Sequence, residues 1–71
     1  MSESAVRNEI RRWRQENGAM TQADLARLCG VTRQTIIALE AEKYSPSLEL
    51  AFRLARALGR NLEEVFRFEE K

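Results

Sequence analysis

Residues 21–40 read TQADLARLCGVTRQTIIALE, and this stretch decides the fold. Thr21 and Thr32 are typical N-caps, and each precedes a short run whose apolar residues recur at helical spacing. Gly30 predicts the end of the first run, because glycine adopts the left-handed conformation at a helix C-terminus without a steric cost. The two helices predicted here run from Gln22 to about Cys29 and from Arg33 to about Ala41.

Two helices this short cannot bury their own apolar faces, so neighbouring helices must hold them at an angle. The predicted inner face of the pair consists of Leu25, Ala26, Cys29, Ile36 and Leu39. This is the construction of a helix-turn-helix, over residues 21–41, whose second helix enters the DNA major groove. The second helix would be about 13 Å long, which suits a groove about 12 Å wide.

The second helix also has an outward face suited to reading bases. At 100° per residue, Gln34, Ile37 and Ala38 point away from the core side, and their neighbours on the helix flank them. Arginine pairs with guanine O6 and N7, glutamine pairs with adenine N6 and N7, and apolar side chains touch thymine methyl groups. The candidate base-reading residues are therefore Arg33, Gln34, Thr35, Ile37 and Ala38.

The rest of the chain predicts three more helices and a strand-like tail. Val6, Ile10 and Trp13 recur at helical spacing, and Gly18 ends this first helix. Apolar residues cover most of the circumference of the fourth helix, so it is expected to be central and buried. The predicted segments are helices from Val6 to about Asn17, Leu48 to Leu58 and Leu62 to Val65, and an alternating tail from Phe66 to Phe68. The fold class is all-α, with five helices in one domain over residues 1–71, and the tail allows a short terminal β-strand pair.

Composition excludes several classes of function. The 71 residues contain one cysteine and no histidine, so a disulfide within the chain is excluded and the usual ligands of a structural zinc site are missing. No glycine-rich phosphate loop or catalytic constellation is visible, and no apolar run approaches the length of a membrane span. We expect a cytoplasmic protein that is not an enzyme, with no cofactor, metal, membrane contact or small-molecule ligand.

The stretch from Met20 to Ile36 resembles the helix-turn-helix of the phage repressor/Cro superfamily, also called the xenobiotic-response-element type. Residues 40–51, EAEKYSPSLELA, resemble the loop and fourth helix of its compact one-domain members, and LEEVF at 62–66 resembles their closing segment. The compact group includes cytolysin-repressor-like regulators, which are similar in length and in an aromatic, strand-like tail. The resemblance covers nearly the whole chain, about residues 6–68, and implies a DNA-binding transcriptional regulator.

The resemblance also implies roles for individual residues. Gln22 matches the position that anchors a DNA phosphate, and Lys43 and Tyr44 match the loop that touches the DNA backbone. Arg14 and Glu40 match an ion pair that bridges the first and third helices. The recognition-helix positions at or near bases are matched by Thr32, Arg33, Gln34, Thr35 and Ala38, and Thr32 is assigned to phosphate with Gln22, Lys43 and Tyr44.

Two departures from the family pattern matter. The turn at residues 17–20 is one residue longer than usual, so the role of Arg14 depends on where the extra residue is absorbed. Ala38 stands where a polar base reader is frequent, so specificity rests more heavily on Arg33 and Gln34.

We expect the chain to act as a homodimer, because a small core gains stability from association. Two copies would place their recognition helices in successive major grooves, about 34 Å apart, on a two-fold symmetric operator. The expected contact is a tail over residues 62–71, and the expected interface residues are Leu58, Val65, Phe66 and Phe68.

The expected activity is repression at a promoter, and we expect no second domain for an inducer. Two alternatives stay open. The chain could be a protein-interaction module that uses Ile37, Ala38 and Ala41 as an apolar patch, or it could be an antitoxin that binds a toxin as well as DNA.

Overall fold

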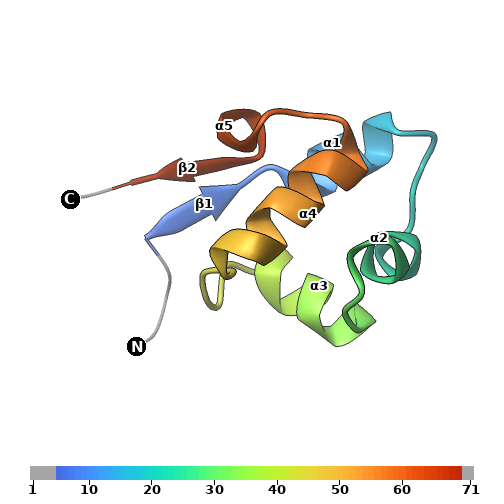
Figure 1. Ribbon diagram of the computed structural model, residues 1–71, viewed down its shortest axis with the longest axis horizontal. Coiled ribbons are helices and arrows are strands. Elements are labelled where there is room, and N and C mark those ends of the chain that lie inside the picture. The colour runs from blue at the N-terminus through green and yellow to red at the C-terminus, as the bar shows by residue number, and fades with distance from the viewer. Residues whose placement is uncertain (1–4, 70–71) are drawn as a thin grey trace.

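The structure is a computed structural model that describes residues 5–69. Figure 1 shows a helical body with a short two-stranded sheet along one side. The elements are, in chain order, β1 (Val6–Asn8), α1 (Ile10–Glu16), α2 (Gln22–Cys29), α3 (Arg33–Glu40), α4 (Leu48–Leu58), α5 (Leu62–Val65) and β2 (Phe66–Phe68). The expected helical fold with a terminal strand pair is confirmed over the described residues.

The helix-turn-helix consists of α2 and α3, and its caps are those that the sequence predicts. Thr21 Oγ1 accepts the Asp24 N–H at 2.9 Å, and an Asp24 carboxylate oxygen accepts the Thr21 N–H at 3.1 Å. Gly30 ends α2 with a φ of 73°, in the left-handed region. Thr32 Oγ1 accepts the Thr35 N–H at 3.3 Å and so begins α3. These local bonds explain why the predicted starts of both helices are confirmed.

The prediction of a first helix starting at Val6 is wrong. Val6 lies in β1, which pairs antiparallel with β2 so that Val6 faces Phe68 and Asn8 faces Phe66. Helix α1 starts only at Ile10, whose N–H donates to Asn8 Oδ1 at 3.2 Å. The sheet therefore joins the two ends of the described chain, and residues 70–71 of the expected tail lie outside the described residues.

One cluster of buried side chains fills the space between the helices, and α4 crosses its centre (Figure 1). The buried stripe of α4 consists of Ala51, Leu54, Ala55 and Leu58. The expectation that α4 is buried on nearly all sides is wrong, because Leu48 is 68% exposed and Phe52 is 51% exposed. These two side chains lie one turn apart on the helix, so α4 presents an apolar face to solvent.

Trp13 fastens α1 to the end of the chain. Its ring is buried, and its Nε1–H donates to the Glu64 carbonyl at 2.9 Å. The guanidinium groups of Arg12 and Arg60 lie 4.4 and 3.9 Å from the ring centroid, where a cation is attracted to the aromatic face. Among residues 5–69, no helix is both long enough and apolar enough to cross a membrane.

Candidate nucleic-acid interface

The exposed side of α3 carries the polar residues that the sequence places there. Arg33 and Gln34 are exposed, whereas Thr35, Ile37 and Ala38 are partly buried. Ile36 and Leu39 are fully buried on the opposite side and anchor the helix in the core. Because Ile37 and Ala38 are partly covered, the apolar patch proposed for a protein partner on this helix is small.

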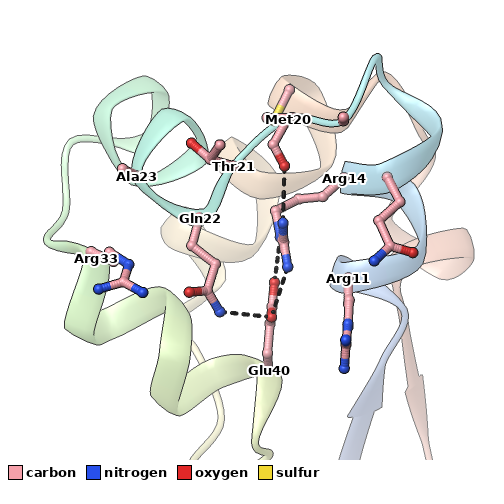
Figure 2. A pocket seen from close by; sticks show the side chains of 10 residues that line it. Arg11, Arg14, Met20, Thr21, Gln22, Ala23, Arg33 and Glu40 are labelled. Carbon is pink, nitrogen blue, oxygen red and sulfur yellow. Dashed lines mark hydrogen bonds and ion pairs between the residues drawn. The ribbon is translucent and has the colours of Figure 1, made fainter.

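A cleft of about 630 Å³ opens between α1, α2 and α3, and its lining includes the first and last residues of α3 (Figure 2). Arg11 and Arg14 of α1, Gln22 of α2, and Arg33 and Glu40 of α3 line it. Figure 2 shows Arg33 and Arg11 on opposite sides of a hydrogen-bonded group formed by the other three. The cleft is therefore basic at both margins, and its only described acidic side chain lies between them.

The ion pair expected between Arg14 and Glu40 is present at the centre of the cleft. Arg14 Nε lies 2.7 Å from Glu40 Oε2, Nη2 lies 3.2 Å from Oε1, and both side chains are 11% exposed. Arg14 Nη1 also donates to the Met20 carbonyl at 2.9 Å, and Gln22 Nε2 donates to Glu40 Oε1 at 3.1 Å. Three donors thus satisfy the Glu40 carboxylate, which reduces its repulsion of an approaching phosphate.

The longer turn before α2 is absorbed without displacing Arg14. Gly18 and Ala19 both adopt left-handed conformations, with φ of 69° and 60°. The Met20 N–H then donates to the Arg14 carbonyl at 3.1 Å, which closes the turn over the arginine backbone. Two consecutive left-handed residues therefore accommodate the extra residue and leave the Arg14 side chain within reach of α3.

The first turn of α2 offers backbone donors to the same cleft. Thr21 Oγ1 caps the Asp24 N–H, and within residues 5–69 the N–H groups of Gln22 and Ala23 have no hydrogen-bond acceptor. The hydrogen bond from the Thr21 N–H is the largest of the contacts that lower the pKa of the Asp24 carboxyl below its usual value. Free N–H groups at a helix N-terminus attract phosphate, because the helix dipole adds partial positive charge there. Gln22 is therefore placed to offer its backbone N–H, while its side-chain amide already binds Glu40.

Most arginines in the described part of the chain are held in ion pairs with Glu or Asp. The described cations that lie in no ion pair are Arg11, Arg33, Lys43 and Arg56. Arg11 and Arg33 line the cleft, and the exposed Lys43 lies in the loop directly after α3. Three of these four cations therefore gather around α3, and Arg56 lies apart, on the exposed side of α4. The sequence interpretation missed Arg11, although its spacing of three from Arg14 places both on one side of α1.

The end of α3 is fastened to β1 by contacts that the sequence interpretation also missed. Asn8 Nδ2 donates to the Leu39 carbonyl at 2.8 Å, and the Asn8 N–H donates to Glu42 Oε2 at 3.1 Å. Arg7 Nη1 donates to Glu42 Oε1 at 3.2 Å. Asn8 and Leu39 are 31 residues apart, so no local pattern could have indicated this contact. The strand pair therefore positions the end of α3 and the loop that carries Lys43.

A helix-turn-helix family model matches residues 10–65, which are most of the chain. The chain belongs to the Cro/C1-type helix-turn-helix family. A relative named an uncharacterized HTH-type transcriptional regulator, from Methanothermobacter thermautotrophicus, is 58% identical over 66 residues, which cover 92% of this chain and 94% of the relative. A relative of the same kind from Bacillus subtilis is 38% identical over 93% of this chain and 98% of the relative.

A solved structure agrees with this helix-turn-helix family. It is a hypothetical transcription factor from Neisseria, which is 31% identical and superposes with a TM-score of 0.68 over 78% of this chain. This chain spans 62% of the length of that protein chain. As a family member, the chain is a DNA-binding regulator and not an enzyme.

Two of the interface residues predicted for this helix-turn-helix protein are corrected by the structure. Leu58 is 1% exposed and Val65 is fully buried, and both pack in the chain's own core. Neither side chain has surface to offer a second copy. Phe66 is partly buried and Phe68 is 67% exposed, so these two remain available for a contact.

Proposed function

We propose that this chain is a sequence-specific repressor that binds duplex DNA as a homodimer on a two-fold symmetric operator. The observation that carries the proposal is the gathering around α3 of cations that form no ion pair within residues 5–69. Arg11 and Arg33 border the cleft beside the helix, and Lys43 follows it. The remaining arginines are, with one exception, neutralised within the described part of the chain. Positive charge is thus concentrated on the side that carries the recognition helix.

Base discrimination is assigned to the N-terminal end of α3. Arg33 and Gln34 are exposed there, and each can form two hydrogen bonds with one base, to guanine and adenine respectively. A good bidentate pair contributes about 1–3 kcal/mol of discrimination. Thr35, Ile37 and Ala38 are partly buried. We expect them to make van der Waals contact with thymine methyl groups where the helix lies deepest in the groove.

Phosphate contacts supply the sequence-independent part of the affinity. We assign them to the backbone N–H groups of Gln22 and Ala23, to the Arg11 guanidinium, and to Lys43 and Tyr44 in the exposed loop. Thr32, exposed at the start of α3, belongs to the same group. Contacts at both ends of α3 would fix the orientation of the helix in the groove.

The dimer follows from the size of the recognition element. One helix of eight residues reads only a few base pairs, whereas two copies about 34 Å apart read two half-sites. Occupation of such a site at a promoter would block polymerase, which is the basis of the proposed repression. The cytoplasm is the compartment we propose for a protein that acts in this way.

The decisive experiment is selection of bound sequences from a random duplex library, with affinity measured at two salt concentrations. A two-fold symmetric site with half-sites about one helical turn apart supports the proposal. Arg33→Ala, selected in parallel, should lose enrichment at one position of each half-site. Weak binding without any enriched sequence would reject sequence-specific recognition and leave a protein-interaction module or an antitoxin as the function to pursue.

A further inference from the structure

An apolar surface lies where α4 meets the strand pair, outside the face assigned to DNA. Leu48 and Phe52 lie one turn apart on α4, and Phe66 and Phe68 alternate on β2, which puts both on one face of the sheet. We call these four residues the α4–sheet face. Leu48, Phe52 and Phe68 are each more than half exposed. Large apolar side chains gathered in one exposed patch mark a surface that associates with another.

A groove of about 270 Å³ runs between the two halves of this face. Pro46 and Leu62 contribute to its walls with Leu48 and Phe66, and carbon dominates its surface. An aromatic side chain buries about 150–250 Å² when it is covered. The exposed fractions of Phe52 and Phe68, 51% and 67%, therefore leave roughly 180–300 Å² of aromatic surface in water. This area is suited to the apolar centre of a standard interface of about 800 Å² per partner.

We propose that the α4–sheet face is where a second copy of this chain docks, an inference that rests on the dimeric function proposed above. The position of the face supports it. The groove includes Pro46, three residues after Lys43, so the face borders the loop that follows α3. A two-fold contact here brings the two loops together between the two α3 helices, and both helices then face the same side of the dimer.

The dimensions of the molecule agree with this arrangement. Half-sites about 34 Å apart require each α3 to lie about 17 Å from the two-fold axis. The molecule measures 34 × 22 × 20 Å, so an axis at its edge is compatible with that distance. An interface on the side of the body opposite α3 would point the two recognition helices in opposite directions.

The charges around the face favour a second copy over a partner of opposite charge. Arg67, between Phe66 and Phe68 on β2, lies 3.0 Å from Glu9 and 3.5 Å from Glu69. The rim therefore carries both signs, and each charge is paired locally. A strongly acidic or basic partner gains little from such a rim, whereas two identical copies meet without an excess of like charge.

The test introduces a charge on the α4–sheet face and compares it with the same change elsewhere. Leu48→Glu and Phe52→Glu place a carboxylate at the centre of the proposed contact. Leu28→Glu is the matched control, because Leu28 is 59% exposed on α2, beside Arg56 and Ala57 and away from the face. Sedimentation equilibrium measures the dimer dissociation constant, and circular dichroism checks that each variant is folded. We expect a rise of about 30-fold or more for the two face variants, as for buried anchor residues, and none for the control.

The outcomes separate the interface from the proposed function. Face variants that stay dimeric, or a control that dissociates equally, overturn the proposal that the α4–sheet face is the dimer interface. A two-fold symmetric site from the library selection would in that case still support the proposed dimeric regulator. A wild-type chain that is monomeric in solution and binds one copy per selected site overturns both. If a face variant unfolds, Phe68→Glu at the exposed strand replaces it, and a dimer that survives this change rejects the proposal.

Discussion

Arg33 and Lys43 border α3 at its two ends, and the structure assigns them different kinds of contact. Arg33 is exposed at the first turn and has no ion-pair partner in the described part of the chain, whereas Lys43 lies in the loop after the helix. We expect Arg33→Ala to remove about 1–3 kcal/mol of discrimination at one base position of each half-site. Lys43→Ala should instead weaken binding to all sequences by the same factor. Competition binding with single-base variants of the operator measures both effects, and an Arg33→Ala protein with unchanged preference would contradict the assignment.

Glu40 stabilises the fold through its pair with Arg14, and its negative charge also opposes DNA binding. One substitution is therefore expected to lower stability and to raise DNA affinity. Glu40→Gln keeps the shape but leaves the Arg14 guanidinium, in a side chain that is 11% exposed, without its counter-charge. We expect the free energy of unfolding to fall by about 2 kcal/mol, measured by urea denaturation. Affinity for non-specific DNA should rise at the same time, because a negative charge leaves the cleft.

The matched control for Glu40→Gln is Glu16→Gln. Glu16 forms a pair with Arg12 at 4.0 Å, and both side chains are more than half exposed. Exposed pairs of this kind contribute at most about 0.5 kcal/mol on a helix. A loss of stability as large for Glu16→Gln as for Glu40→Gln would show that burial of the Arg14–Glu40 pair is not the cause.

At the scale of the elements, the turn between α1 and α2 stores backbone strain at a single position. Ala19 has a φ of 60°, which costs a residue with a Cβ about 1–2 kcal/mol, whereas Gly18 adopts its φ of 69° freely. Replacing Ala19 with glycine removes this cost but recovers only part of it as stability, because glycine is more flexible in the unfolded chain. We therefore expect Ala19→Gly to stabilise the protein by about 0.5–1 kcal/mol and Gly18→Ala to destabilise it by a similar amount.

Thermal denaturation of the two turn variants measures both signs. A Cβ added at Gly18 meets no atom within 4 Å, so a loss of stability there reports on the backbone conformation alone. Equal signs for the two substitutions would mean that the left-handed conformations of this turn are not populated in solution.

The elements that the sequence predicts correctly are those whose limits depend on neighbouring residues. The starts of α2, α3 and α4 are set by Thr21, Thr32 and Ser47, which each cap a backbone N–H three residues later. The sequence predicts too early a start for α1, because Val6 matches the helical spacing of Ile10 while its partner in the sheet is 62 residues away. Contacts across such distances are not encoded in a local pattern.

In the candidate site, too, features set by neighbouring residues are predicted, and features set by distant contacts are not. The exposed residues of α3 follow from helical spacing, and the Arg14–Glu40 pair follows from the family resemblance. The structure brings Arg33 and the Arg14–Glu40 pair to one cleft. The contact of Asn8 with the end of α3 joins residues 31 apart, and the exposure of Leu48 and Phe52 depends on which elements pack against α4. Apolar residues around a helix do not indicate which side remains uncovered, and two of the four predicted interface residues, Leu58 and Val65, are buried in the core.

At the scale of the whole molecule, a net charge of +1 gives little long-range attraction for DNA. Affinity must therefore come from a few cations on one face. The salt dependence of the binding constant measures how many phosphate contacts these cations make. The logarithm of the binding constant falls with the logarithm of salt concentration by about 0.9 for each phosphate contact. A dimer in which Arg11 touches one phosphate per copy would lose about 1.8 from this slope in Arg11→Ala.

Arg56→Ala is the matched control for Arg11→Ala, because Arg56 also lies in no ion pair among the described residues but is on the exposed side of α4 beside Leu28. Its salt slope should equal that of the wild type. Titration of the selected operator at several salt concentrations measures all three proteins. An unchanged slope in Arg11→Ala would remove Arg11 from the interface, and equal changes in the two variants would mean that charge acts through the whole molecule. A slope that falls only for Arg11→Ala ties the affinity to the cleft between α1, α2 and α3.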